Sequence, residues 1–152
     1  MIEADALLIF GTGGNLAIAQ HAEADLLRLT EKRISAPGGS VAVTALANEF
    51  GEEEWLSMWA LDELRGAGQA DGVAAIGLSC SGVSLAVMAA LRDLGVRGAI
   101  PILIAGKSPR QVEVEHLIEL DARFYHRAET LMSLLMYQLA VACGGQPKRL
   151  GD

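Results

Sequence analysis

The feature that most constrains the fold of this chain is a short, unbroken apolar run at residues 73–78. A run of this length without polar alternation is typical of a strand buried on both faces, as in the middle of a parallel sheet. The run ends at Ser79-Cys80-Ser81-Gly82, and apolar residues return at helical spacing over residues 83–94. The pattern therefore predicts a central parallel strand, a tight turn and a helix.

The turn between this strand and this helix is a candidate anion-binding site. The first N–H groups of a helix have no partner within the helix, and the helix dipole favours negative charge there. Ser79, Ser81 and Ser84 add hydroxyl donors, and no lysine or arginine lies in the turn. A nucleotide P-loop places Lys-Ser or Lys-Thr after its glycines, so this turn favours a phosphate on a small molecule, held by neutral donors. A serine-rich helix cap without a ligand is the alternative.

Strand and helix patterns alternate along the whole chain, which is the signature of a parallel α/β sheet. Strands are expected at residues 6–10, 33–36, 73–78, 99–105 and 116–120, and helices at 16–30, 40–50, 52–65, 83–94 and 128–143. We expect Ser40 to cap its helix and Gly51 to separate two helices. The sequence predicts a single domain, residues 1–152, with a three-layer α/β/α sandwich, five parallel strands and flavodoxin-like topology.

Composition limits the classes of function. The chain has 152 residues, 51% of them hydrophobic, and a formal net charge of −7. This charge, without a cluster of Lys and Arg, argues against a nucleic-acid partner. The acidic start is unlike a secretory signal, and the apolar stretch at residues 131–143 is too short to cross a membrane. With only Cys80 and Cys143, we expect a cytoplasmic protein without a disulfide framework.

The first expected turn, Gly11-Thr12-Gly13-Gly14-Asn15, is a second candidate anion site. NAD binding is disfavoured because the dinucleotide fingerprint needs glycine at position 16, which is Leu16, and an acidic residue at the end of the next strand. In the later turn, Cys80 is a candidate for a lowered pKa near a helix N-terminus. A hydrolase is nevertheless disfavoured, because residues 77–81 do not match Gly-x-Ser-x-Gly.

Three segments of the chain resemble the sugar isomerase (SIS) domain and, within it, the phosphoheptose isomerases. They are residues 10–15 (Phe-Gly-Thr-Gly-Gly-Asn) with 19–21 (Ala-Gln-His), residues 44–51 (Thr-Ala-Leu-Ala-Asn-Glu-Phe-Gly) and residues 77–84 (Gly-Leu-Ser-Cys-Ser-Gly-Val-Ser). The resemblance implies that the third segment holds the phosphate of a sugar phosphate. The implied phosphate and sugar contacts are Gly13, Gly14, Asn15, Ser40, Ser79, Cys80, Ser81, Gly82 and Ser84.

The resemblance also implies catalytic residues, with departures from the family pattern. The family's glutamate base falls on Asp25, its acid/base histidine on Tyr137 and a nearby glutamine on Glu129, whereas His21 is kept. An aldose–ketose isomerase needs a base for a carbon-bound proton and an acid for the oxygen. His21 and Asp25 are four residues apart, and we expect both to point toward the Gly13-Gly14 turn.

Other interpretations of these residues stay open. A His–Asp pair at this spacing is often an ordinary surface or interface pair, and Tyr137 also suits a core or an interface. The resemblance implies zinc as a candidate cofactor, bound at His21, Asp25, Glu129 and Tyr137. This set offers one imidazole and two carboxylates, which is a weaker zinc site than one with two imidazoles.

The sequence thus supports two functions. One is an aldose–ketose isomerase of the phosphoheptose type, acting on sedoheptulose 7-phosphate or a related sugar phosphate. The other is a non-catalytic SIS module that binds a phosphosugar or a protein partner, as in relatives that associate with a replication initiator. The last helix, residues 128–143, is apolar around its circumference, so we expect a homodimer or homotetramer with Met136 and its neighbours buried between chains.

Overall fold

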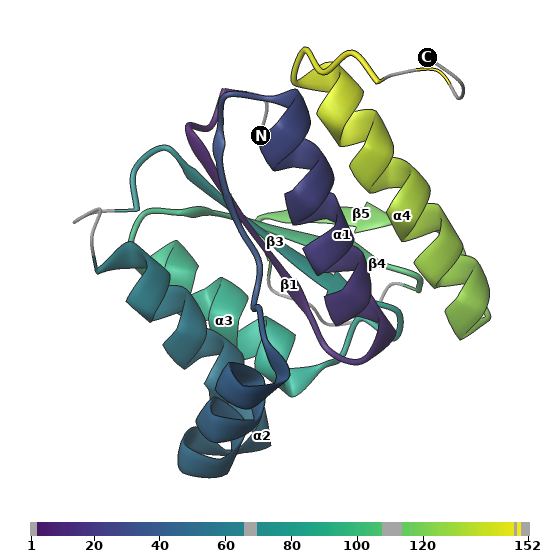
Figure 1. Cartoon of the computed structure of the whole chain (residues 1–152). Coiled ribbons are helices and arrows are strands. Elements are labelled where there is room, and N and C mark those ends of the chain that lie inside the picture. The colour runs from purple at the N-terminus through teal and green to yellow at the C-terminus, as the bar shows by residue number, and fades with distance from the viewer. Residues whose placement is uncertain (1–2, 66–69, 108–113, 148, 150–152) are drawn as a thin grey trace.

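The computed structural model describes residues 3–65, 70–107, 114–147 and 149, and it confirms the three-layer α/β/α sandwich (Figure 1). Five parallel strands form one sheet in the order β2-β1-β3-β4-β5. The strands are β1 (Ala6–Gly11), β2 (Arg33–Ser35), β3 (Val73–Ser79), β4 (Ile100–Ala105) and β5 (His116–Glu119). The helices are α1 (Gly14–Leu29), α2 (Ser40–Leu64), α3 (Leu85–Val96) and α4 (Tyr125–Ala142).

β3 is the middle strand, as its unbroken apolar run predicts. Every residue from Val73 to Ser79 is buried, and the strand pairs with β1 on one side and β4 on the other. A strand with helices over both faces and strands on both sides has no polar surface, so its sequence needs no alternation. The expected turn after β4 includes Ser108 and Pro109, which lie outside the described residues.

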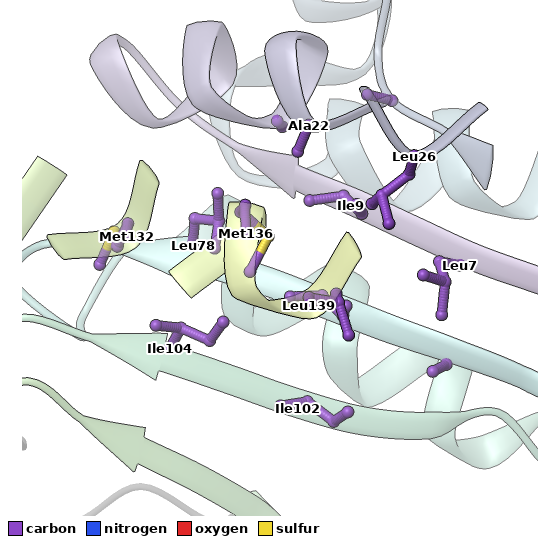
Figure 2. Close-up of a cluster of buried hydrophobic side chains, with 14 of the residues drawn as sticks. Leu7, Ile9, Ala22, Leu26, Leu78, Ile102, Ile104, Met132, Met136 and Leu139 are labelled. Carbon is purple, nitrogen blue, oxygen red and sulfur yellow. The ribbon is translucent and has the colours of Figure 1, made fainter. Parts of the chain in front are cut away.

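Alternating side chains of the sheet build two apolar cores. Toward α1 and α4, Leu7 and Ile9 of β1 pack with Leu26 of α1 and with methionines of α4 (Figure 2). On the opposite face, Phe10 meets Trp59 of α2 edge to face, with ring centroids 6.1 Å apart and an interplanar angle of 65°. α1 and α4 therefore cover one face of the sheet, while α2 and α3 cover the other (Figure 1).

α2 departs from the expectation at its start and in its middle. Ser40 is the first helical residue, and the N-cap position belongs to Gly39, which makes no side-chain capping bond. The break expected at Gly51 is real, because this residue has φ 83° and ψ 169° inside an otherwise continuous helix. Residues 40–50 contribute no buried side chain, and Figure 1 shows this half extending away from the sheet.

α4 buries one face in the core of the chain itself. Met132 and Met136 lie against the sheet, and Met136 is only 4% exposed within a single chain (Figure 2). The expectation that Met136 is buried between chains is therefore wrong: the helix turns this residue toward the apolar sheet. The large apolar side chains that α4 leaves exposed are those of Tyr125, Leu134, Tyr137 and Val141, and the last three follow one another at helical spacing.

Two further expectations from composition concern membrane spans and disulfides. None of the helices in the described part of the chain combines the length and the hydropathy needed to span a lipid bilayer. Cys80 and Cys143 are both free thiols.

A polar contact joins α2 to α3 between the apolar residues. The buried Ser57 hydroxyl donates to Oδ2 of Asp93 at 2.5 Å, and Nε of Arg92 donates to Oδ1 at 3.0 Å. Burial alone would raise the pKa of Asp93, but the hydrogen bonds from Ser57 and Arg92 and the charges of Arg92 and Arg97 hold it below its ordinary value of 3.8. The charged carboxylate thus stabilises the folded state.

We expect Asp93→Asn to lower the free energy of unfolding by about 1–3 kcal/mol at neutral pH, the usual range for hydrogen bonds to a charged group. Because folding lowers the pKa of Asp93, its charge stabilises the protein fully at pH values above the pKa of the unfolded state. This stabilisation is lost as the pH falls through the pKa of the folded state. Urea unfolding, measured from neutral to acidic pH, should therefore show the free energies of unfolding of the unmodified protein and of Asp93→Asn converging below pH 3.8. The exposed Asp62→Asn variant is the control, and a penalty that does not change with pH would contradict the assignment.

Candidate functional site

The loops that follow β1 and β3 lie side by side at the carboxyl edge of the sheet. The helix after β1 covers one face and the helix after β3 covers the other, so the chain order reverses between these two strands (Figure 1). Ligands of open α/β sheets bind outside the carboxyl ends of the strands at such a point. A cleft of 470 Å³ lies there, lined by Thr12 and Gly13 after β1, by Ser84, Leu85 and Ala86 at the start of α3, and by residues of α1 and α2.

Two helices begin at this cleft without a side-chain cap. Ser84 is the N-cap residue of α3, with φ −63° and ψ 115°, and its side chain makes no capping hydrogen bond. Gly13 is the N-cap residue of α1, where its φ of 59° favours glycine, and α1 has no side-chain cap either. The N–H groups of Leu85 and Ala86 belong to the first turn of α3, which lines the cleft. Uncapped N–H groups and two helix dipoles together favour an anion.

Two further serines, Ser79 and Ser81, lie in the segment between β3 and α3, but of the three serines only Ser84 lines the cleft. Ser79 is 2% exposed and lies opposite Ala105, on the face of the sheet that carries α2 and α3. The Ser79 hydroxyl has no hydrogen bond to another described residue. Every fully buried side-chain oxygen or nitrogen among the described residues has a hydrogen-bond partner, so the Ser79 oxygen is not fully buried and contacts solvent. Ser81 is exposed, and its oxygen accepts only a long bond of 3.4 Å from the N–H of Val83. These hydroxyls keep a free donor for a ligand.

Two of the implied ligand contacts hydrogen-bond to each other. The Cys80 thiol donates to Oδ1 of Asn15 at 3.3 Å, and the two residues are 8% and 7% exposed. Burial raises the pKa of Cys80, opposed by the Asn15 bond and reinforced by the charge of Glu129. The expected lowering of this pKa is wrong, because the thiol lies in the core between the sheet and α1 and α4 rather than at the start of α3. The two side chains thus link the turns after β1 and β3.

Three of the four candidate catalytic residues meet in a second pocket, a groove of 160 Å³ between α1 and α4. His21 and Asp25 of α1 and Tyr137 of α4 line it together with Ser133. Oδ2 of Asp25 lies 3.4 Å from Nε2 of His21, and Oδ1 accepts a hydrogen bond of 2.9 Å from Arg28. The structure thus brings Tyr137 beside His21 and Asp25, from which the sequence separates it by more than a hundred positions.

The groove and the cleft have no lining residue in common. α1 presents Leu16 to the cleft, whereas Ile18, His21 and Asp25 line the groove farther along the helix. No residue of the Gly13-Gly14 turn lines the groove, and the direction expected for His21 and Asp25 stays a prediction.

Glu129 and Ser40 lie apart from the residues expected beside them. The carboxylate of Glu129 lies so close to Gly14 that a side chain there would collide with it, and its Oε2 is 3.5 Å from Nδ1 of His126. Over the described residues, no three His, Cys, Asp or Glu side chains form a group that could hold a metal ion, and zinc binding stays a prediction. Ser40 is exposed and does not line the cleft.

Three solved structures show similar folds. No family model and no curated protein matches the chain by sequence. The phosphoheptose isomerase of Neisseria gonorrhoeae is 23% identical with a TM-score of 0.73, over 93% of this chain and 76% of that one. The sugar isomerase domain of an RpiR transcription factor from Sphaerobacter thermophilus is 20% identical with a TM-score of 0.55, over 91% and 72% of the two chains. The chain has the sugar isomerase (SIS) domain fold.

The third similar structure is the Vibrio vulnificus NanR protein complexed with ManNAc-6P. It is 14% identical with a TM-score of 0.60, over 91% of this chain and 48% of that one. These similarities confirm the SIS fold that the three sequence segments suggest. The roles of the individual site residues remain predictions.

The sequence patterns did not predict that residues of α2 form part of the cleft wall. Glu52, Glu53 and Trp55 line the cleft directly after the bend at Gly51, and Val43 and Ala47 line it before the bend. In the sequence, the acidic residues have an ordinary explanation as the start of a helix, where the dipole favours them. Gly51 could have indicated this wall, because a glycine with positive φ bends the helix between the two groups of lining residues.

Proposed function

We propose that this chain is a phosphosugar-binding SIS domain. The observation that carries the proposal is the cleft at the switch point of the sheet, where the uncapped start of α3 and the hydroxyl of Ser84 face a volume of 470 Å³. Neutral donors at a helix N-terminus suit a phosphate, and a cleft of this volume accommodates a small sugar. The NanR complex adds support, because a protein of similar fold is complexed there with ManNAc-6P.

Replacing Leu85 with proline is expected to weaken binding of sedoheptulose 7-phosphate by roughly 10- to 100-fold, the loss of one hydrogen bond to a charged group. Leu85 is the first residue of α3, a position where proline is tolerated and removes only the N–H group. Ser84 already has the extended conformation that proline prefers in the residue before it. Isothermal titration calorimetry measures the affinity.

Leu85→Ala is the matched control, because it shortens the same side chain and keeps the N–H group. Equal affinities of the proline and alanine variants would show that the start of α3 does not bind the phosphate. An unmodified protein that binds no sugar phosphate would refute the proposed function itself.

We infer, as a finer form of this proposal, an aldose–ketose isomerase of the phosphoheptose type with Asp25 as base and Tyr137 as acid. The groove supports it by placing both side chains beside His21. No residue lines both the cleft and the groove of one chain, so we propose that turnover uses a second copy whose groove closes on the cleft. The exposed apolar residues Leu134 and Val141 flank Tyr137 on α4 and suit such an interface in a homodimer or homotetramer. The free thiols suit a cytoplasmic protein.

A non-catalytic phosphosugar-binding module is the second candidate. The observation that favours it is the state of the proposed base: one oxygen of Asp25 accepts a hydrogen bond from Arg28 and the other lies against His21. Both oxygens of the proposed base thus already have partners within one chain.

A further inference from the structure

The carboxylate of Glu129, on α4, lies against the first residue of α1. A Cβ atom placed on Gly14 would be 2.2 Å from Oε1 of Glu129 and 2.9 Å from its carboxyl carbon. Gly14 is not among the glycines with positive φ, so its backbone conformation does not require glycine. The missing side chain of Gly14 therefore serves the close approach of the Glu129 carboxylate.

This carboxylate supplies a negative charge that the start of α1 otherwise lacks. α1 has no acidic residue in its first turn and no side-chain cap. The Glu129 side chain is 30% exposed, and within the described ranges no lysine or arginine forms an ion pair with it. A helix start favours one negative charge, and a second anion placed there would meet the first at close range.

The two helix starts at the cleft therefore differ. Gly13 and Ser84 both line the cleft, and each is the N-cap residue of its helix. Gly13 is followed directly by Gly14, against which the carboxylate of Glu129 lies from the α4 side of the sheet. The start of α1 is thus occupied by an anion of the chain itself, which opposes a phosphate there.

We propose that Glu129 is a specificity-determining residue, which excludes a second phosphate from the start of α1 and so restricts the ligand to a single phosphate. A sugar monophosphate with its phosphate at the start of α3 presents only neutral hydroxyl groups to the turn after β1. A sugar bisphosphate brings a second phosphate to that turn, where Glu129 repels it. The inference rests on the proposed function and limits its substrate class.

The test is isothermal titration calorimetry with sedoheptulose 7-phosphate and sedoheptulose 1,7-bisphosphate. We expect the unmodified protein to bind the monophosphate at least about 10-fold more tightly, a discrimination that one like charge at close range provides. Glu129→Gln keeps the shape of the side chain and removes its charge. This variant should bind the bisphosphate about 10-fold more tightly than the unmodified protein does, and its affinity for the monophosphate should change by less than about 3-fold.

Glu119→Gln is the matched control, because Glu119 ends β5 at the same edge of the sheet and does not lie against Gly14. This variant removes the same charge and should keep the discrimination between the two ligands. Thermal unfolding checks that both variants are folded.

A second measurement needs no ligand. Burial raises the pKa of Cys80, the hydrogen bond to Asn15 opposes this rise, and the charge of Glu129 adds to it. In a Cys143→Ser background, the ultraviolet absorbance of the thiolate follows the titration of Cys80 alone, since these are the two cysteines of the chain. Glu129→Gln should lower this pKa, whereas Glu119→Gln should leave it unchanged.

The outcomes distinguish this inference from the proposed function. Equal or tighter binding of the bisphosphate by the unmodified protein would overturn the exclusion and leave phosphosugar binding in place. A discrimination that survives Glu129→Gln, or that Glu119→Gln removes equally, would do the same, as would an unchanged pKa of Cys80 in Glu129→Gln. If the unmodified protein does not bind sedoheptulose 7-phosphate, the proposed function and the inference both fail.

Discussion

Replacing Phe10 with alanine is expected to lower the free energy of unfolding by about 3–5 kcal/mol, the usual cost of removing a buried aromatic ring. Phe10 is 0% exposed, lies near the end of β1 and meets Trp59 of α2 edge to face. Its partner in register on β3 is Gly77, whose missing side chain leaves room that Val87 and Leu91 of α3 occupy. These residues already pack against the sheet, so they cannot close the cavity. Urea denaturation followed by fluorescence measures the loss.

The matched control is Phe124→Ala, because Phe124 is 74% exposed just before α4. This variant should change the free energy of unfolding by no more than about 0.5 kcal/mol. Similar losses for the two variants would show that Phe10 does not form the core on the α2 side of the sheet. Phe10→Leu should recover much of the stability, since it keeps apolar volume in the cavity.

Replacing Asp25 with asparagine is expected to reduce turnover of sedoheptulose 7-phosphate by at least about 100-fold, the lower end of what a general base contributes. The isomerase form of the proposal makes Asp25 the group that removes the carbon-bound proton, and asparagine cannot do so. Asp25 belongs to neither apolar core and does not line the cleft, so the variant should stay folded and bind the sugar phosphate as before. The assay is formation of the aldose phosphate, with thermal unfolding as a check.

Glu23→Gln is the control for this variant, since Glu23 lies on the same helix but does not line the groove. A stricter test mixes Asp25→Asn with Leu85→Pro chains. If one chain's groove acts on another chain's cleft, the mixture should recover activity that neither variant has alone. Phosphosugar binding by the unmodified protein without any aldose formation would instead favour the non-catalytic module.

Several features of this protein are local and were predicted from the sequence. The position of β3 follows from a run of apolar residues without alternation, which suits only a strand covered on both faces. The break at Gly51 follows from glycine's access to positive φ, and the turn after β3 follows from the point where that apolar run ends. The three family-like segments were sufficient for the SIS fold, because their spacing is set by the strands and helices between them.

Tertiary packing decided what local patterns could not. Met136 and Leu134 look alike in the sequence of α4, but only the crossing of the helix over the sheet buries the first and leaves the second exposed. The environment of Cys80 depends on the face of the sheet to which its side chain points. On that face the thiol lies in the core and hydrogen-bonds to Asn15. The separation of groove from cleft and the place of Glu52 depended on how α1 and α2 are directed at the carboxyl edge. The sequence by itself determined which segments form strands, helices and the turn after β3, because hydrophobic period and turn chemistry act over a few residues. Which side chains share a pocket was decided only by the tertiary structure, because it depends on contacts between segments far apart in the chain.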